Sequence, residues 1–142
     1  MDISSFLYEG LKINGIFIYP EILFEQLDEY LNDYFINEQT TNQKIITYKN
    51  IEFCFIDDKL YYWQIDTYER KLLLGKNIKV SGLGFKDFLK FLNKKKVKWA
   101  ITRELSFDKQ ITVRITETNV DFVFSFEEKT SGKIEIIGYT HP

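Results

Sequence analysis

The sequence has very little cysteine, histidine and proline, and each shortage excludes something. Cys54 is the only cysteine, so no intramolecular disulfide can form, and a zinc site lacks the Cys and His ligands it needs. His141 is the only histidine and stands next to the last residue, so Ser-His-Asp and Cys-His arrangements have no imidazole to place in a cleft. With only Pro20 and Pro142, few helices or strands are interrupted by a missing N–H donor.

The sequence also lacks a long apolar run and a large net charge. No stretch of about 18 apolar residues occurs, and no signal-peptide pattern follows Met1. Together with the single cysteine, these absences predict a cytoplasmic protein with no membrane partner. The net charge of −2 is too small to indicate a dedicated nucleic-acid binder, so we expect no nucleic-acid partner.

Two short motifs are weak signals for ligand chemistry. Asp57-Asp58 offers two carboxylates to a hard cation, but adjacent residues in a hairpin turn usually face water, and no EF-hand spacing follows. Gly82-Leu-Gly-Phe precedes a helical pattern, but it lacks the third glycine and the Gly-Lys-Ser/Thr ending of phosphate loops. The sequence therefore predicts no metal, no cofactor and no catalytic residue.

Aromatic residues, in contrast, are abundant, with 13 Phe, 9 Tyr and 2 Trp in 142 residues. Disordered chains are poor in such residues, so we expect a single ordered domain over residues 1–142. The frequent Ile, Lys, Asn, Phe and Tyr are typical of an AT-rich bacterial genome. The charge is unevenly distributed: residues 1–43 hold eight acids and one base (−7), and residues 44–142 hold 13 acids and 18 bases (+5).

Hydrophobic spacing predicts one helix and three strands in the first half. Residues 16–19 look extended because they precede Pro20, which suits the first turn of a helix. Apolar residues at spacings of three and four then predict a helix whose apolar face runs from Leu23 to Tyr34. The polar stretch 37–44 predicts a loop. Strands are predicted at Ile45–Tyr48, Ile51–Ile56 and Leu60–Asp66, with turns at Lys49-Asn50 and Asp57-Asp58-Lys59.

The second half has the same order of elements. Residues 82–92 predict a helix, with Phe85, Phe88, Leu89 and Leu92 at helical spacing. Strands are predicted at Ile111–Thr116, Val120–Phe126 and Lys133–Tyr139, joined by turns at 117–119 and 127–132. The shared order of turn, helix and three antiparallel strands predicts two repeats, 10–66 and 75–139. Chance similarity is the alternative, because this order is common in chains of this class.

Alternation along the strands assigns side chains to two faces of a sheet. The face predicted to lie under the helices contains Ile51, Phe53, Phe55, Tyr61, Trp63, Ile65, Ile111, Val113, Ile115, Val120, Phe122, Phe124 and Phe126. The other face contains Glu52, Cys54, Tyr62, Gln64, Thr112, Arg114, Asp121 and Ser125. We therefore predict an α+β fold, a curved antiparallel sheet with helices packed on one face and the other face left for water or a partner.

The first predicted helix is unusually acidic. Its surface carries Glu21, Glu25, Asp28, Glu29 and Asp33, with no base among them. Like charges four residues apart destabilise a helix by roughly a few tenths of a kcal/mol per pair. Their presence favours a cationic partner, and solubility alone is the alternative explanation.

The order of a helix and then antiparallel strands, given twice, resembles the tandem-repeat architecture of β-lactamase inhibitor proteins. It is also similar to several small bacterial immunity proteins, which neutralise a cognate toxin. Gly15–Leu31 with Ile51–Asp66, and Gly82–Leu92 with Val120–Tyr139, carry the resemblance. It implies a non-enzymatic inhibitor that binds through the open face of the sheet and its loops. The secreted inhibitors have disulfides and this chain has none, so the resemblance is architectural.

The leading hypothesis is a protein-binding inhibitor of the immunity-protein type, whose partner is a cationic bacterial toxin such as a nuclease. One alternative is a structural or regulatory interaction module that self-associates, for instance as a homodimer through the exposed sheet or its edge. Another is a hydrolase that uses only carboxylates. The candidate partner-binding residues lie on the second face, the loops and the acidic helix: Glu52, Asp57, Asp58, Tyr62, Gln64, Tyr68, Glu69, Arg114, Asp121, Glu21, Glu25 and Asp28.

Overall fold

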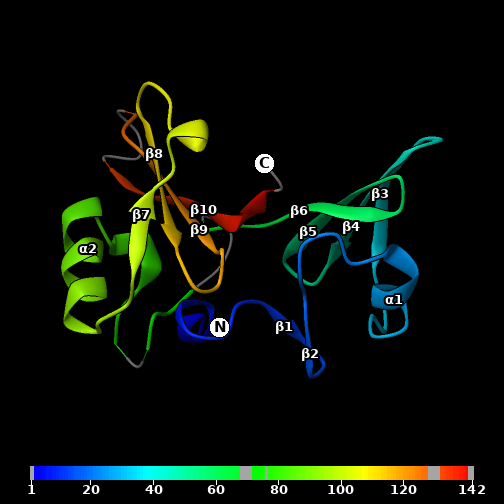
Figure 1. Ribbon diagram of the computed structural model, residues 1–142, viewed down its shortest axis with the longest axis horizontal. Helices are drawn as coiled ribbons and strands as arrows, with labels where there is room; N and C mark the ends of the chain where they lie inside the picture. The colour runs from blue at the N-terminus through cyan, green and yellow to red at the C-terminus, as the bar shows by residue number, and fades with distance from the viewer. Residues whose placement is uncertain (1, 68–71, 76, 128–131, 141–142) are drawn as a thin grey trace. The chain divides into compact units, whose positions relative to one another are not determined.

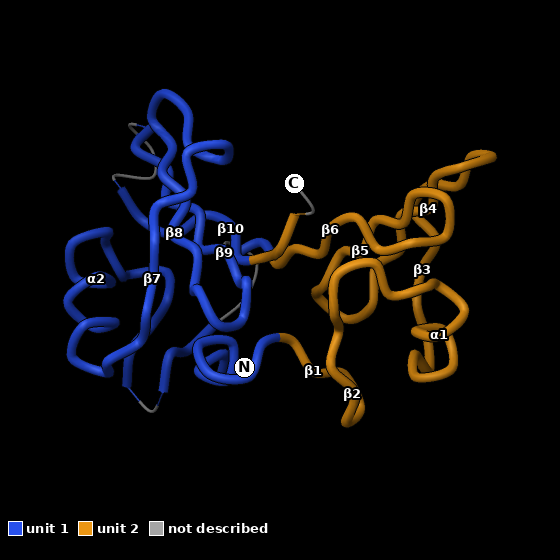
Figure 2. Tube along the Cα trace, viewed as in Figure 1, with its two compact units in different colours: residues 1–10, 66–137 blue, residues 11–65, 138–142 orange. Residues whose placement is uncertain are grey.

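The computed structural model describes residues 2–67, 72–75, 77–127 and 132–140 (Figure 1). The chain divides into two compact units (Figure 2). Unit 1 comprises residues 1–10 and 66–137, and unit 2 comprises residues 11–65 and 138–142. None of the described helices has the length and apolar character that a membrane crossing requires.

Unit 2 contains one short helix and a row of antiparallel strands. Its elements are β1 (Lys12–Ile13), β2 (Ile16–Phe17), α1 (Phe24–Asp28), β3 (Phe35–Gln39), β4 (Gln43–Tyr48), β5 (Ile51–Ile56) and β6 (Lys59–Asp66). The strands lie in the order β3-β4-β5-β6, and each of these neighbours is antiparallel. Asp57 and Asp58 turn the chain from β5 to β6 with φ of 51° and 65°, the left-handed backbone that a tight two-residue hairpin needs.

Unit 1 contains a longer helix and a second row of strands. Its elements are η1 (Ser4–Leu7), η2 (Val80–Gly82), α2 (Phe85–Lys94), β7 (Trp99–Ile101), η3 (Arg103–Leu105), β8 (Gln110–Ile115), β9 (Asp121–Ser125) and β10 (Lys133–Thr140). The order is β10-β9-β8-β7, and β7 with β8 and β8 with β9 are antiparallel. β10 contributes residues 133–137 to this unit and residues 138–140 to unit 2.

The structure confirms a largely antiparallel α+β fold and all six predicted strands. The predicted loop at 37–44 is wrong, because β3 extends to Gln39 and β4 begins at Gln43. The first predicted helix is far shorter than expected, since α1 ends at Asp28 and Glu21 has φ of 65°, outside helical backbone. The second predicted helix is confirmed as α2. One helix followed by four strands occurs in each unit, and the internal duplication stays a prediction.

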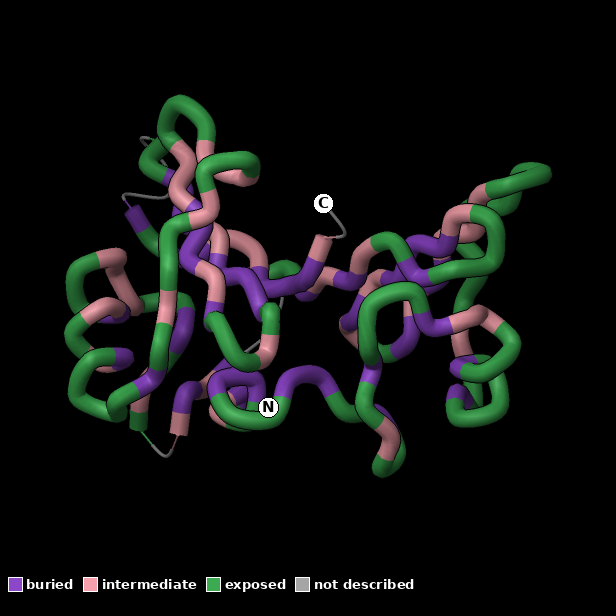
Figure 3. Tube along the Cα trace, in the orientation of Figure 1, coloured by how far each residue is buried: buried purple, intermediate pink, exposed green. Residues whose placement is uncertain are grey.

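Each helix contacts large aromatic side chains of its own unit. Phe88 of α2 lies 4.7 Å from Phe122 and 5.3 Å from Phe124 between ring centroids. Phe24 of α1 meets Phe55 edge-on at 5.2 Å. All these rings except Phe24 are buried, and buried residues run along the inner strands of each unit (Figure 3). The predicted core side chains Phe55, Phe122 and Phe124 therefore lie against the helices, because burial of aromatic surface drives this packing.

A β-bulge explains one wrong core assignment. Cys54 pairs with Tyr62 and Phe55 pairs with Leu60, which leaves Tyr61 as the extra residue in β6. The bulge turns Leu60 into the core and Tyr61 toward solvent, so simple alternation fails at this point. Phe126 is also exposed, because it follows the last residue of β9.

The prediction that the second face is open is wrong at several positions. Cys54 in unit 2 is buried, although it lies opposite Phe53 and Phe55 in the alternation. In unit 1 Thr112 is fully buried because η3 and the following residue cover it. The remaining buried residues of that predicted face are Asp121 and Ser125. This face of β8 and β9 is therefore largely closed by the chain itself.

Candidate functional site

The candidate site is an acidic hollow on unit 2, beside α1. It has a volume of about 360 Å³ and is lined by Ile16, Tyr19, Ile22, Leu23, Glu25, Gln26, Glu29 and Tyr30. Tyr19 and Tyr30 are 49% and 40% exposed, so two aromatic rings remain available at its rim. Glu25 and Glu29 are both exposed and stand four residues apart. The hollow thus combines apolar floor residues, two phenol rings and two carboxylates.

Local hydrogen bonds fix the wall of the hollow. The Gln26 side chain accepts a bond from the Leu23 N–H at 3.0 Å and one from the Tyr19 hydroxyl at 3.3 Å. The Asn14 side chain donates to the backbone carbonyl of Tyr30 at 2.5 Å. α1 is only five residues long, so the backbone groups at its two ends lack helical hydrogen-bond partners. The side chains of Gln26 and Asn14 bond the Leu23 N–H and the Tyr30 carbonyl instead. The Tyr19 side chain is therefore bonded to α1, and the backbone at Tyr30 is bonded to Asn14.

The hollow carries acidic residues and no basic ones. Unit 2 carries nine acids and four bases, a formal charge of −5, whereas unit 1 carries 12 acids and 15 bases, +3. No lysine or arginine occurs between Lys12 and Lys44, the segment that contains the whole hollow. Among the described residues, neither Glu25 nor Glu29 forms an ion pair. The hollow therefore presents uncompensated negative charge, which attracts cationic groups.

A second cluster joins three predicted partner-binding residues on β5 and β6. The Tyr62 hydroxyl donates to Glu52 at 2.6 Å, and the Gln64 amide donates to the same carboxylate oxygen at 3.3 Å. Burial raises the pKa of Tyr62 far above its ordinary value of 10, and the bond to Glu52 adds to the effect. All three side chains are half-buried. They form a cross-strand network that satisfies its own members.

The other predicted partner-binding residues of unit 2 lie apart from this network. Asp57 and Asp58 are exposed turn residues, and Asp58 accepts the Phe24 N–H through its backbone carbonyl at 2.8 Å. Asp28 on α1 accepts a hydrogen bond from the Tyr34 hydroxyl at 2.7 Å, which raises the pKa of Tyr34. Tyr68 and Glu69 lie outside the described residues. Of the predicted acidic helix surface, only Glu25 and Glu29 line the hollow.

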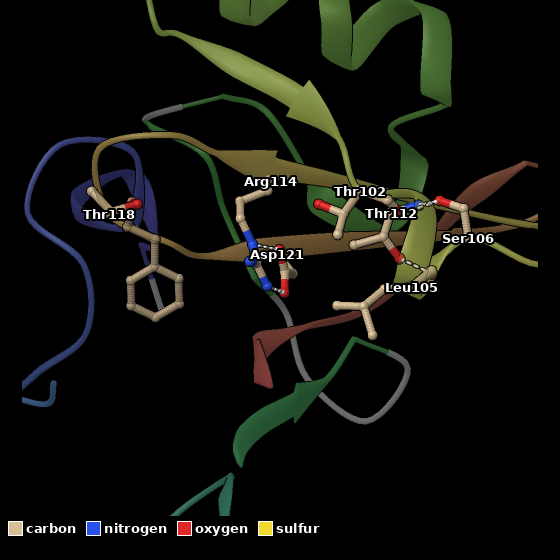
Figure 4. A network of polar contacts seen from close by, with 8 residues as sticks. Thr102, Leu105, Ser106, Thr112, Arg114, Thr118 and Asp121 are labelled. Atoms are coloured by element: carbon tan, nitrogen blue, oxygen red, sulfur yellow. Dashed lines mark hydrogen bonds and ion pairs between the residues drawn. The ribbon is translucent and has the colours of Figure 1, made fainter. Parts of the chain in front are cut away.

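In unit 1 the predicted residues Arg114 and Asp121 belong to a structural network (Figure 4). The Arg114 guanidinium donates two bonds of 2.8 Å to the Asp121 carboxylate, which is buried. Nearby, the Thr112 hydroxyl donates to the Leu105 carbonyl at 2.6 Å. The Thr118 hydroxyl donates to the Phe6 carbonyl at 2.7 Å. Burial contradicts the assignment of Asp121 to an exposed binding face.

Cys54 lies on β5 and is buried. Burial raises the pKa of the Cys54 thiol, and the carboxylates of Glu52 and Glu38 raise it further. A buried thiol of this kind is unreactive. In the described ranges, no three His, Cys, Asp or Glu side chains gather closely enough to hold a metal ion.

Sequence reasoning did not assign Tyr19, Tyr30 and Gln26 to a binding surface. The sequence predicts an acidic surface here, but it places Tyr19 in an extended segment and Tyr30 on the apolar face of a long helix. The signal that identifies them is a segment with a tyrosine at each end, Tyr19 and Tyr30, and four acids but no base between them. A short helix exposes such rings, whereas a long one packed on a sheet buries them.

Comparisons with known proteins give one match. A family model described as Domain of unknown function (DUF8273) matches residues 23–140, most of the chain. No curated protein matches the chain. No solved structure matches it either.

Proposed function

This chain belongs to the DUF8273 family, a domain of unknown function, and we propose that it is a non-enzymatic inhibitor of the immunity-protein type. It binds a cationic bacterial toxin in the cytoplasm and blocks it through the acidic hollow of unit 2. An inhibitor needs a rigid scaffold and a few aromatic or charged anchors, and it needs no catalytic group.

The observation that carries the proposal is the pairing of exposed tyrosines with uncompensated carboxylates in one concave surface. Tyr19 and Tyr30 offer ring faces, and Glu25 and Glu29 offer charge. A lysine or arginine side chain can bind favourably to both kinds of group. Its alkyl stem and its charge contact a tyrosine ring, and its N–H donors form hydrogen bonds with a carboxylate. Tyrosine and charge-assisted anchors of this type dominate the binding energy of protein interfaces. The formal charge of −5 on unit 2 also speeds the approach of a cationic partner.

The test is coexpression of the full chain with a cationic effector protein encoded beside its gene. We expect the chain to restore growth and to bind the purified effector. A Glu25→Gln/Glu29→Gln double variant should weaken that binding by roughly tenfold to a hundredfold, because each lost contact costs on the order of 1 kcal/mol or more. Raising the salt concentration should slow association of the parent chain more than that of the variant.

The matched control changes charge equally on unit 1. Glu104 and Glu117 are exposed, and a Glu104→Gln/Glu117→Gln variant should bind as the parent chain does. The inhibitor function is wrong if the parent chain neither binds nor protects. The role of the hollow is wrong if the two double variants lose affinity alike.

A self-associating interaction module is the second candidate. It is favoured by the apolar side chains that the outer strands expose, Phe35 and Ile36 on β3 and Ile101 on β7. Sedimentation of the purified chain separates the two functions. A stable dimer without any partner favours the module, and a monomer favours the inhibitor.

A further inference from the structure

β3 is the outer strand of unit 2, and one of its edges is open. In the strand order it neighbours β4 alone. All five of its residues are exposed (Figure 3). The exposed fraction is 77% for Phe35 and 54% for Ile36. Within the described residues, no backbone hydrogen bond reaches β3 from a segment other than β4. Such an edge presents unpaired N–H and C=O groups on which another chain can form a ladder.

β3 has few of the features that usually prevent an edge strand from pairing with another chain. It contains neither lysine nor proline, and five residues are enough for a ladder. A bulge does occur between Ile36 and Glu38, where the Asn37 side chain donates to the Thr47 hydroxyl at 2.8 Å. That bond ties the bulge to β4. Phe35 and Ile36 are successive residues and point to opposite faces, so an added strand meets an apolar side chain on each face.

Charge selects the kind of strand that fits. Three acids, Glu29, Asp33 and Glu38, lie on β3 or in the segment between α1 and β3, and no base occurs from residue 13 to residue 43. We propose that β3 pairs with an extended, lysine- or arginine-rich segment of another protein. This inference rests on the proposed function, because it makes that segment part of the cationic toxin. Main-chain bonds then supply affinity, and alternate cationic side chains supply specificity.

A second copy of the chain fits the edge less well. Pairing β3 with another β3 brings together two units that each carry −5. Like charges facing each other across an interface are unfavourable. The outer strand of unit 1, β7, has only three residues and is followed almost at once by η3, so it is too short to match β3. The observations therefore favour a different, cationic protein.

The test uses the full chain labelled with ¹⁵N and a backbone-cyclised β-hairpin whose outer strand alternates lysine with valine. A cyclised hairpin is already ordered, so it avoids most of the entropy lost on binding. With this hairpin we expect the amide resonances of residues 35–39 to shift and their hydrogen exchange to slow by about tenfold or more. The same hairpin with glutamate in place of each lysine should leave these amides unchanged.

Two matched variants locate the contact. Ile36→Lys adds an edge lysine to β3 and should weaken hairpin binding by roughly fivefold or more. Ile101→Lys makes the same change on β7 and should leave the affinity as it was. Edge pairing is overturned if residues 35–39 keep their free exchange rates, if only the acidic hollow responds, or if both variants behave alike.

The two proposals fail separately. Toxin neutralisation combined with unchanged exchange at residues 35–39 overturns edge pairing and leaves the inhibitor function in place. Slowed exchange with the lysine hairpin, but no neutralisation of the effector, overturns the inhibitor function and keeps the edge as a binding surface for cationic strands.

Discussion

Arg114 and Asp121 pair directly across β8 and β9 and form a two-bond ion pair. Nε and Nη2 of Arg114 donate to Oδ1 and Oδ2 of Asp121, each at 2.8 Å. The aspartate side chain is 4% exposed and that of the arginine 21%. Burial raises the pKa of Asp121, and the guanidinium opposes this effect. The arginine is therefore what makes an ionised carboxylate tolerable at this buried position.

Replacing Arg114 with methionine should lower the free energy of unfolding by about 3 kcal/mol at pH 7, because a buried carboxylate loses its partner. The loss should shrink toward pH 4. A carboxyl whose pKa is raised in the folded state favours folding below its ordinary value of 3.8, and this contribution disappears as the pH rises through the folded value. Urea unfolding at both pH values measures the effect. An Arg114→Met/Asp121→Asn variant should recover part of the loss, and a loss that is equal at both pH values contradicts the argument.

Gly138 has no room for a side chain. A Cβ atom there would collide with the Trp63 carbonyl oxygen and lie 3.0 Å from the Cα of Gln64, and both of these are backbone atoms. Gly138→Ala should therefore reduce the free energy of unfolding by at least about 2 kcal/mol. Gly82→Ala is the control, because its Cβ meets nothing within 4 Å, and it should change stability by less than about 0.5 kcal/mol. Equal urea midpoints for the two variants would contradict the close approach.

The Cys54 thiol should resist alkylation in the folded protein. It is buried, and its pKa is raised, so both access and the thiolate fraction are low. With iodoacetamide at pH 8, we expect the reaction to be at least about a hundredfold slower than in urea, where one thiol per chain should react. Mass spectrometry follows the reaction. Similar rates with and without urea would show that this face of β5 opens readily.

Stability should fall at alkaline pH because of Tyr62. Its pKa is raised in the folded state, so the unfolded chain releases the phenol proton first. The stabilising contribution is complete below the ordinary value of 10 and is lost as the pH rises above it. Tyr62→Phe should cost about 1 kcal/mol at pH 7 by removing the bond to Glu52, yet it should flatten the decline above pH 10. Unfolding curves from pH 8 to 11 test this, and parallel declines would contradict it.

The strands were predictable wherever burial imposed alternation. Phe53 and Phe122 are buried in β5 and β9, and their apolar neighbours two residues apart gave the pattern. β3 had no such pattern, because all of its residues are exposed and three of them are polar. The bulge at Tyr61 could not be predicted from the sequence for a different reason. It depends on pairing with another strand, and local sequence does not encode that directly.

The acidic helix was predicted too long because its apolar spacing continues to Tyr34, well past the end of α1 at Asp28. Glu25 and Glu29 repel at four-residue spacing, and Glu21 adopts left-handed backbone, so only a single turn and a half of helix forms. The same charges pointed correctly to an acidic surface. Its concave shape and its tyrosines depend on where α1 ends, and spacing alone did not give that end.

The way β10 is shared between the units constrains how the chain is assembled during translation. Unit 1 needs residues 1–10 together with residues 66–137, and unit 2 needs residues 11–65 together with residues that follow 137. Neither unit is therefore complete until β10 has been synthesised. A growing chain carries two incomplete sheets until then, and both units close only once β10 is available. A fragment that ends before Lys133 lacks β10, so both units should then be without part of their sheets.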